Sequence, residues 1–262
     1  MESCRLHLNR RQEIDQPQRL LGRDIELAMK AQAGLFPRRL PLLETLSYAG
    51  VCMQAQEVGG DYYDFFSTAH RRMGFAVADV TGKGLGAALL MANLQGILRS
   101  QLRLGGMDIA HLPALANQLC LESWPEATYA TLFLAEYDDE ASRLRYVNCG
   151  HPPPLLVHAE GSLDQLESTA GVLGLFEEWE CATVEMQLSP GDTLLAFSDG
   201  LMETLDAAGT EFGRARVTDL VRAGGRLPVS LLLESIVAEV KSFSQEQGDD
   251  MTMVAIRCGK WQ

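Results

Sequence analysis

Nine short apolar segments, most of them followed closely by a turn, constrain the fold of this chain more than any other feature of its sequence. In chain order they are LSYAGVCMQAQ (46–56), DYYDFF (61–66), MGFAVADV (73–80), ATLFLAEYD (130–138), RLRYVNCG (143–150), PPLLVHA (153–159), TVEMQL (183–188), DTLLAFS (192–198) and MTMVAIRC (251–258). Segments of this kind predict strands. Helical periodicity occurs between them in pairs, at about 85–104 with 108–122 and 212–223 with 228–244. This order favours antiparallel sheets covered by helices over a doubly wound parallel sheet.

The segment before the first predicted strand, residues 17–35, has the periodicity of a helix. Its apolar side chains form two adjacent stripes, Leu21, Ala28 and Leu35 in one and Leu20, Leu27 and Ala31 in the other. Pro37 disfavours helical geometry at the residue before it, so we expect the helix to end there. A helix of this length is only marginally stable alone in water. It therefore packs either on its own domain or on a second copy of the chain, and the second alternative predicts a homodimer.

The change in pattern after this helix predicts the domain organisation. We expect an N-terminal tail and helical linker over residues 1–37, and one folded domain over residues 38–262. No internal repeat and no low-complexity linker divides the second part. A chain of 262 residues with 47% hydrophobic content is long enough to bury a sizeable core.

Charge and cysteine content argue against several classes of function. The formal net charge of −13 disfavours a nucleic-acid surface, because phosphate neutralisation needs clustered Lys and Arg. The six cysteines contain no CxxC pair, so neither a zinc knuckle nor a disulfide framework is expected. The N-terminus has no apolar signal-peptide core, and no run approaches the ~18 apolar residues that span a bilayer. We therefore expect a cytoplasmic protein without membrane insertion.

Four acids share one context, the end of a predicted strand beside a glycine or a turn. They are Asp61 in VGGDYYDFF, Asp79 in FAVADVTGKG, Asp199 in LLAFSDG and Asp249 in QGDDMT. Asp-Gly pairs are also ordinary turn residues. Four acids at four strand ends nevertheless favour a shared site in the loops, where functional residues concentrate.

If these strand ends converge, the carboxylates repel one another and raise each other's pKa unless a cation neutralises them. Oxygen ligands without His or Cys favour Mg²⁺ or Mn²⁺ over Zn²⁺. Two such ions that share a carboxylate can activate a water and hold a phosphoryl group in line. The sequence therefore predicts that a metal holds Asp249 at the mouth of its strand and that Asp250 supports it.

Five ordered motifs give the sequence a resemblance to a known family. They are EVGGDYYDFF, VADVTGKGLGAALLMA, YVNCGHPPPLLV, LLAFSDGLMET and GDDMTMVAIR. Over about residues 45–257 the chain resembles the PPM-type metal-dependent serine/threonine protein phosphatases, in particular the bacterial SpoIIE/RsbU branch. The resemblance implies an α+β fold, a four-layer α-β-β-α sandwich of two antiparallel sheets flanked by helices. It also implies a binuclear Mn²⁺ or Mg²⁺ centre in a cleft at one edge of the sheets.

The resemblance also implies the ligand set. Asp61 and Asp79 match the acids around the bridged metal pair, and the carbonyl of Val80 matches a backbone ligand. Asp199 and Asp249 match the remaining carboxylates on the first metal. The family's acids are all present, which favours an active enzyme. The chain departs from the family pattern in TGKG, where histidine is frequent in place of the lysine, and in AGVLGLF, which lacks a proline.

Several neighbouring residues fit structural roles better than chemistry. Asp64 lies three residues after Asp61, so a strand points it to the opposite face, where a structural hydrogen bond is expected. Glu203 fits a helix cap or an outer-shell contact. His151, among a glycine and prolines, is expected to fix a turn rather than act as a general acid. Lys83 is expected to be a solvated loop lysine, with contact to substrate phosphate as the alternative.

By resemblance, the activity is hydrolysis of phosphoserine or phosphothreonine in a protein by a metal-activated water. The implied substrate is a phosphorylated STAS-type anti-sigma-factor antagonist of a partner-switching pathway. Two alternatives stay open, a phosphoprotein-binding module with little turnover and a metal-stabilised scaffold that dimerises through the N-terminal helix. Cys4 and Arg10 have the spacing of a cysteine-dependent phosphate loop, but the residues between them include no glycine, so we interpret the match as chance.

Overall fold

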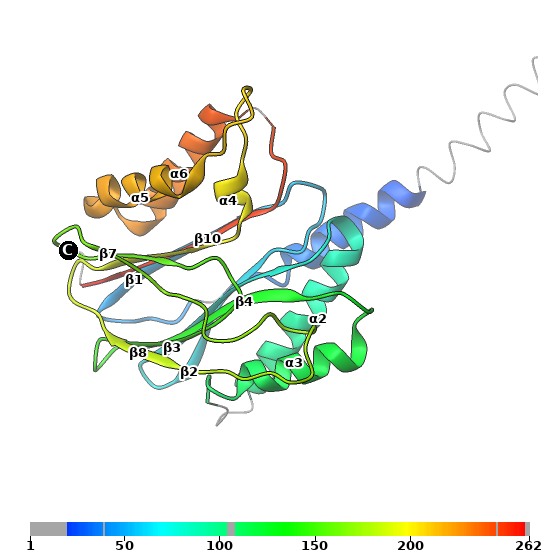
Figure 1. Cartoon of the computed structure of the whole chain (residues 1–262), viewed down its shortest axis with the longest axis horizontal. Helices are drawn as coiled ribbons and strands as arrows, with labels where there is room; N and C mark the ends of the chain where they lie inside the picture. The colour runs from blue at the N-terminus through cyan, green and yellow to red at the C-terminus, as the bar shows by residue number, and fades with distance from the viewer. Residues whose placement is uncertain (1–19, 39, 104–107, 245, 260–262) are drawn as a thin grey trace, which may run out of the picture.

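The structure is a computed structural model that describes residues 20–38, 40–103, 108–244 and 246–259. The predicted N-terminal tail, with Cys4 and Arg10, lies outside these residues. In the described part, ten strands form two five-stranded sheets with antiparallel pairing throughout (Figure 1).

The first sheet has the strand order β1-β10-β9-β6-β7. Its strands are β1 (Leu46–Met53), β6 (Leu155–Val157), β7 (Leu163–Gln165), β9 (Thr193–Phe197) and β10 (Met251–Cys258). The second sheet has the order β2-β3-β4-β5-β8. Its strands are β2 (Tyr62–Ala69), β3 (Arg72–Val80), β4 (Ala130–Asp138), β5 (Arg143–Cys149) and β8 (Val184–Gln187).

Helices cover both outer faces of the paired sheets (Figure 1). The helices are α2 (Gly84–Arg103), α3 (Leu112–Ser123), α4 (Gly200–Glu203), α5 (Gly213–Ala223) and α6 (Val229–Phe243). Helices α2 and α3 pack on the second sheet, whereas α5 and α6 pack on the first. The predicted α-β-β-α sandwich is therefore confirmed.

Three apolar layers hold the sandwich together. Phe75 and Phe133 lie fully buried between the two sheets, with ring centroids 6.0 Å apart. Met91 anchors α2 on the second sheet, and Ile236 anchors α6 on the first. Burying each side chain of this size contributes about 1.5–3 kcal/mol, so the layers fix the strand ends at which the acids lie.

Most predicted boundaries agree with the structure, and β4 and β10 coincide with the predicted segments. The helix predicted from Asp108 begins instead at Leu112. Residues 108–111 form a turn in which Asp108 Oδ1 accepts a hydrogen bond from the Ala110 backbone N–H, and Pro113 suits the first turn of the helix. The short elements β7 and α4 were not predicted, because three or four residues carry too little periodicity.

The N-terminal helix, residues 20–33, extends away from the sandwich (Figure 1). Its side chains Leu20, Leu21 and Leu27 are exposed to 56%, 60% and 64%. After the helix, Leu35 packs against the core between α2, α3 and the second sheet. The C-terminal end of this segment therefore packs on its own domain, whereas Leu20, Leu21 and Leu27 stay exposed.

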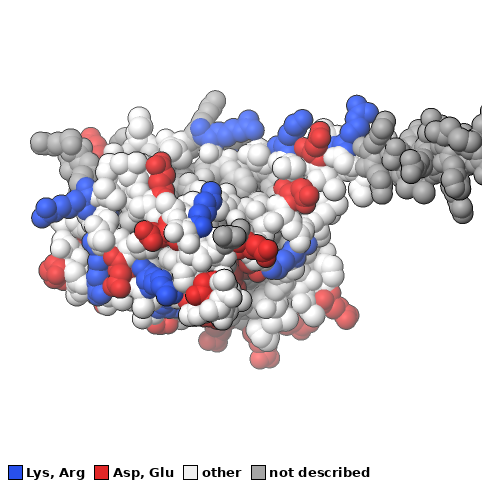
Figure 2. Space-filling model, turned by 90° about the horizontal axis from the view of Figure 1, so that it is seen from above, with Lys and Arg blue, Asp and Glu red and all other residues white. Residues whose placement is uncertain are grey.

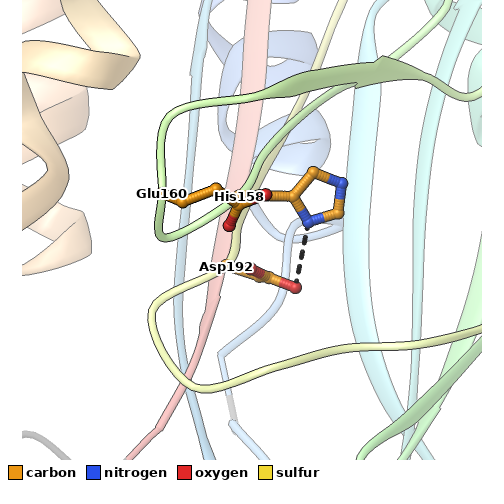
Figure 3. A group of neighbouring side chains, drawn as sticks. All are labelled: His158, Glu160 and Asp192. Carbon is orange, nitrogen blue, oxygen red and sulfur yellow. Dashed lines mark ion pairs between the residues drawn. The ribbon is translucent and has the colours of Figure 1, made fainter.

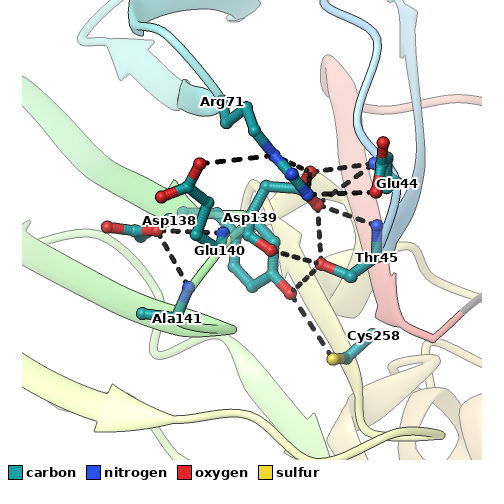
Figure 4. Close-up of polar contacts among 9 residues, drawn as sticks. Glu44, Thr45, Arg71, Asp138, Asp139, Glu140, Ala141 and Cys258 are labelled. Atoms are coloured by element: carbon teal, nitrogen blue, oxygen red, sulfur yellow. Dashed lines mark hydrogen bonds and ion pairs between the residues drawn. The ribbon is translucent and has the colours of Figure 1, made fainter.

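A buried carboxylate joins the two sheets (Figure 4). It follows the end of β4, whereas Asp79 pairs with Thr131 near the start of that strand. Asp139, 2% exposed, follows β4 and accepts hydrogen bonds from the Thr45 backbone N–H (2.8 Å) and Oγ1 (2.6 Å), which lead into β1. It also accepts from the Glu44 backbone N–H and from Arg71 Nη2, both at 3.0 Å. Burial alone raises the pKa of Asp139, but hydrogen bonds from Thr45 and Glu44 outweigh it and leave the pKa below its usual value.

Replacing Asp139 with Ala is expected to lower the free energy of unfolding by about 2–4 kcal/mol, because several buried donors lose their acceptor. Urea unfolding measures this loss. Glu140→Ala, which removes the adjacent acid with a side chain 66% exposed, is the control and should change stability by less than about 0.5 kcal/mol. Equal effects for the two variants would show that the buried carboxylate does not join the sheets.

Helices in the described ranges include none that is both long and apolar enough to cross a membrane. On the face shown in Figure 2, acidic side chains alternate with Lys and Arg instead of separating into patches of one sign.

Candidate metal centre

The four acids predicted at strand ends come together at one edge of the sandwich. Asp61 precedes β2 and Asp79 lies near the end of β3, both in the second sheet. Asp199 follows β9 and Asp249 precedes β10, both in the first sheet. Asp79 raises the pKa of Asp61, and Asp249 raises the pKa of both Asp79 and Asp199, so the charges are close enough to interact. The strand ends of two sheets therefore meet in one acidic cluster.

Asp61 is the most buried of the four acids, with 1% of its surface exposed. Its Oδ2 accepts a hydrogen bond from Ser198 Oγ at 2.7 Å. Its Oδ1 is buried and has no partner of hydrogen-bond geometry among the described residues, although the Thr252 side chain lies near enough to lower the pKa of Asp61. Burial first, and then the charge of Asp79, raise the pKa of Asp61 well above its usual value. A buried carboxylate oxygen without a donor is costly unless something else neutralises it.

The other acids show the same electrostatic conflict. Burial, followed by the charges of Asp199 and Asp249, raises the pKa of Asp79 from 3.8 to about 7. Burial and then the charge of Asp249 raise the pKa of Asp199. Between described residues, one ion pair involves these four acids, from Lys83 Nζ to Asp249 Oδ2 at 2.8 Å. The cluster is therefore short of positive charge.

The donor set fits divalent cations. All four side chains offer carboxylate oxygens, and the carbonyl of Val80, at the end of β3, lies against Gly60, the residue before Asp61. Hard oxygen donors with several negative charges suit Mg²⁺ or Mn²⁺. A cation here would neutralise the repulsion that raises the pKa of Asp79 and would supply a partner for Asp61 Oδ1.

Glycines let neighbouring backbone segments of each sheet approach closely at this edge. A Cβ on Gly60 would lie 2.5 Å from the Val80 carbonyl oxygen. A Cβ on Gly200 would lie 2.1 Å from the Asp250 carbonyl oxygen. Real Cβ atoms do not come so near to backbone oxygen, so both positions require glycine for the acids to converge.

Asp250 supports the cluster through its hydrogen bonds, as predicted from the sequence. It is 8% exposed, and its Oδ1 accepts a hydrogen bond from the Ala55 backbone N–H at 2.7 Å. Its Oδ2 accepts from the Gly60 backbone N–H at 2.9 Å. Asp250 thereby ties the start of β10 to the turn that carries Asp61.

Lys83 and Glu203 lie at the rim of the cluster. Lys83 lies in an exposed loop, as expected, with 48% of its side chain exposed; its ammonium also donates to the Gly248 carbonyl at 2.8 Å and pairs with Asp249. Hydrogen bonding to Asp249 raises the pKa of Lys83. The charge of Asp199 raises the pKa of Glu203, whose side chain is exposed. The contacts of Lys83 with Gly248 and Asp249 were not predicted, because its loop and the loop before β10 face each other only in the folded chain.

Asp64 and His151 have structural roles, as predicted. Asp64 is fully buried and accepts hydrogen bonds from Arg99 Nε (2.5 Å), Arg99 Nη2 (2.7 Å) and the Tyr62 hydroxyl (2.6 Å). His151 is 1% exposed, with its Nδ1 2.8 Å from Thr131 Oγ1. Burial lowers the pKa of His151 to about 3. A neutral, enclosed imidazole of this kind is not suited to donate a proton to a substrate.

A groove of about 760 Å³ opens beside the cluster. Its lining includes Asp249, Gly200, Glu203, Leu205 and Phe243.

A second group of possible metal ligands lies elsewhere (Figure 3). Its members, His158, Glu160 and Asp192, were not predicted. Asp192 accepts hydrogen bonds from the Ala159 backbone N–H at 3.1 Å and the Ser189 backbone N–H at 2.9 Å. His158 Nδ1 lies 3.3 Å from Asp192 Oδ2, and a hydrogen bond to a neighbouring acid in β7 raises the pKa of His158. The group forms an ion-paired connection between two turns.

The role of Ser198 beside the four acids was also not predicted from the sequence. Ser198 donates to Asp61 and accepts a hydrogen bond from the Thr252 backbone N–H at 2.9 Å. It therefore links the first sheet to an acid of the second. Its position directly before Asp199 was the available signal, but a serine beside a turn has many other uses.

Comparisons with known proteins agree with this fold. The family model described as stage II sporulation protein E (SpoIIE) matches residues 69–259. Phosphoserine phosphatase RsbU of Bacillus subtilis (strain 168) is 28% identical over 181 residues, which cover 69% of this chain and 53% of that protein.

Two solved structures share the architecture. The SiaA-PP2C domain of Pseudomonas aeruginosa matches with a TM-score of 0.80 at 21% identity, over 92% of this chain and 98% of that chain. The RsbU and RsbW domains of Rv1364c from Mycobacterium tuberculosis match with a TM-score of 0.72 at 26% identity, over 84% of this chain and 62% of that chain.

The family match includes three of the four acids, Asp79, Asp199 and Asp249, whereas Asp61 precedes it. The chain spans about half the length of the curated relatives it matches, between 41% and 53% of the first three. The matched family segment covers most of both sheets. The chain therefore belongs to the SpoIIE family of PPM-type phosphatase domains.

Proposed function

We propose that this protein is a metal-dependent phosphoserine/phosphothreonine protein phosphatase. Two Mn²⁺ or Mg²⁺ ions would be held by the cluster of Asp61, Asp79, Asp199 and Asp249 together with the Val80 carbonyl. The observation that carries this proposal is the convergence of the four carboxylates, among which Asp61 keeps a buried oxygen without a donor.

When bound, the ions supply an activated water and neutralise charge on the phosphoryl group. The chain's own residues prepare that site. Ser198 orients the Asp61 carboxylate, and Asp250 holds the turn before it. Lys83 places a positive charge next to Asp249 at the rim, where a phosphate dianion would enter. Direct attack by water needs no covalent intermediate on the enzyme.

The proposed substrate is a phosphorylated STAS-type anti-sigma-factor antagonist in the cytoplasm. Support comes from the relative named phosphoserine phosphatase RsbU and from the solved protein in which an RsbU domain and an RsbW domain occur together. The groove beside Asp249 has room for a phosphorylated side chain and its flanking residues.

Hydrolysis of p-nitrophenyl phosphate with added Mn²⁺, followed by a phosphoserine peptide, tests the proposal. We expect turnover that EDTA abolishes and that cysteine alkylation leaves in place, because the proposed chemistry uses no thiol. A protein that binds phosphopeptide and Mn²⁺ without turnover would be the binding module instead. Loss of activity on alkylation alone would contradict the metal mechanism.

We further propose that the N-terminal helix mediates a homodimer or receives an upstream input. Three leucines of this helix, Leu20, Leu21 and Leu27, are more than half exposed. Exposed apolar side chains grouped on one helix favour binding to a partner helix. The helix ends next to the loops that lead to Asp61, so its partner could influence the metal cluster.

Leu21→Glu combined with Ala28→Glu is expected to lower the mass measured by light scattering towards that of a monomer and to change turnover. Two charges on the apolar stripe would oppose helix pairing. Lys30→Glu, on an exposed position of the same helix, is the control for charge alone. If mass and turnover of the double variant equal those of the parent, the helix is neither a dimer contact nor a control element.

A further inference from the structure

The groove beside the four acids lies between two loops that are far apart in the sequence. One loop follows α4 and contributes Leu205 and Asp206 to the lining. The other joins α6 to β10, contributes Glu246 and leads to Asp249. Because Asp249 belongs to both the groove and the acidic cluster, a ligand held at the cluster has this groove directly beside it.

The described lining residues of the groove carry negative charge and no positive charge. The acids are Glu203, Asp206, Glu246 and Asp249, and the lining includes no Lys, Arg or His. Among the described residues, only Asp249 of these four forms an ion pair, which is the one with Lys83. Several like charges in a concave surface create a potential that attracts the opposite charge. The groove therefore favours a ligand that carries positive charge.

The acid on the α4 side of the groove is held in place and stays ionised. Asp206 Oδ1 accepts hydrogen bonds from the backbone N–H groups of Thr210 at 2.8 Å and Ala208 at 2.9 Å. These hydrogen bonds lower the pKa of Asp206. Glu246, on the other loop, is exposed. Neither acid is one of the proposed metal ligands, so their charges stay available to a ligand when the metals are bound.

Apolar side chains lie among these acids. Leu205 is 51% exposed, and Phe243, at the end of α6, lines the same groove. The ring of Phe243 packs edge-on against Phe212, with centroids 5.2 Å apart. Arg216 stacks on Phe243 and donates to the Phe212 carbonyl at 2.9 Å, but it is not among the lining residues. Phe243 is therefore fixed by its neighbours, whereas Leu205 presents an uncovered apolar surface.

We propose that this groove recognises the residues next to the phosphoserine of the substrate and selects a segment with a basic and an apolar side chain. Asp206 and Glu246 would pair with the Lys or Arg, and Leu205 would contact the apolar side chain. A segment with acids at the same positions would be repelled. The inference rests on the proposed function for the phosphoserine and adds the kind of sequence around it.

A simpler explanation is that these acids only raise the net charge of a soluble surface. Two double variants separate the explanations, because each removes two negative charges. Asp206→Asn with Glu246→Gln changes the groove, and asparagine keeps an oxygen for the Thr210 N–H. Glu140→Gln with Asp219→Asn is the control, because these side chains are 66% and 78% exposed and do not line the groove.

The test measures kcat/KM with Mn²⁺ for phosphoserine peptides in which a single Lys, Ser or Glu is moved along both sides of the phosphoserine. At the positions that reach the groove, the parent should prefer Lys to Glu by about fivefold or more. Asp206→Asn with Glu246→Gln should reduce this preference to about twofold or less, whereas the control pair should keep it. Salt at about 0.5 M should weaken the preference in the parent, because it screens exposed charges.

A second peptide series, with a single Leu moved in the same way, tests the apolar contact. The parent should prefer Leu to Ser at one or more positions by about threefold or more. Leu205→Ser should remove this preference. Leu231→Ser is the matched control, because Leu231 is a 45% exposed leucine of α6 that does not line the groove. Retention of the leucine preference in Leu205→Ser would contradict the proposed contact.

Peptides with a non-hydrolysable phosphonate in place of the phosphate separate this inference from the proposed function. Their binding, measured by fluorescence anisotropy, should show the same preference for Lys over Glu, and this result would support the inference even if no peptide were hydrolysed. Absence of turnover for every phosphopeptide would contradict the proposed function. Equal binding and equal turnover of all peptides, or equal effects of the two double variants, would overturn the inference and leave the phosphatase activity in place.

Discussion

Replacement of Asp199 by Asn is expected to lower turnover at least about 100-fold while leaving the fold intact. Metal ions contribute several kcal/mol to stabilising the transition state in such sites, and each 1.36 kcal/mol is tenfold in rate. Removing a proposed ligand weakens that contribution. Asp249→Asn should behave in the same way. The measurement is hydrolysis of p-nitrophenyl phosphate at saturating Mn²⁺.

The same substitution should raise the melting temperature of the metal-free protein or leave it unchanged. The charge of Asp199 helps to raise the pKa of Asp79, so its removal relieves repulsion within the cluster. Such opposed effects on activity and stability are typical of functional sites. Asp219→Asn, with a side chain 78% exposed on α5, is the control and should change neither property. Turnover of Asp199→Asn close to that of the parent would refute its place in the cluster.

Replacement of Asp250 by Ala is expected to lower the free energy of unfolding by roughly 2–4 kcal/mol and to weaken metal binding. Two backbone N–H groups, of Ala55 and Gly60, would lose their acceptor, and each unsatisfied buried donor costs about 1–3 kcal/mol. The Gly60 turn would also lose one of the contacts that hold it. Urea unfolding in EDTA isolates the stability effect from the metal.

Asp249→Ala gives the matched comparison, since this neighbour has a side chain 41% exposed. Its removal should cost less than about 1 kcal/mol of stability yet abolish most turnover. Asp250 would then be the structural residue of the pair and Asp249 the functional one. Similar stability losses for both variants would contradict this division.

The sequence predicted the architecture because its signals are local. Segments such as 130–138 and 251–258 carry enough apolar and β-branched residues to predict a strand without tertiary information, and both agree with β4 and β10. The elements β7 and α4 are too short to carry such a signal. The start of α3 was wrong by four residues, since a local Asp108 turn competes with the helix there.

The site was less predictable, because its contacts join distant parts of the chain. The four acids could be identified at strand ends, but their convergence depends on how two sheets pack. Ser198 lies 137 residues from Asp61, to which it donates a hydrogen bond. Gln32 reaches Gly59 only because the helix ends beside that turn. No periodicity within a short window contains such information.

Metal binding should depend on pH in a direction that follows from Asp79. Burial and neighbouring acids raise the pKa of Asp79 from 3.8 to about 7 in the metal-free protein. The pKa of Asp79 is higher in the folded protein than its unfolded value of 3.8. The protonated group therefore stabilises the folded protein fully below pH 3.8, and that stabilisation is lost as the pH rises towards 7. The metal-free protein should therefore lose stability over this range, and the stabilisation by added Mn²⁺ should grow with pH.

The most direct test of the metal centre is a calorimetric titration with Mn²⁺ at about pH 6 and about pH 8, with the parent beside Asp199→Asn. We predict two ions per parent chain, with binding roughly tenfold tighter at the higher pH, because an acid with a pKa near 7 must first release its proton. Asp199→Asn should bind at least one ion fewer or bind far more weakly. A parent chain that binds no Mn²⁺ at either pH, or a variant that binds like the parent, would contradict the account.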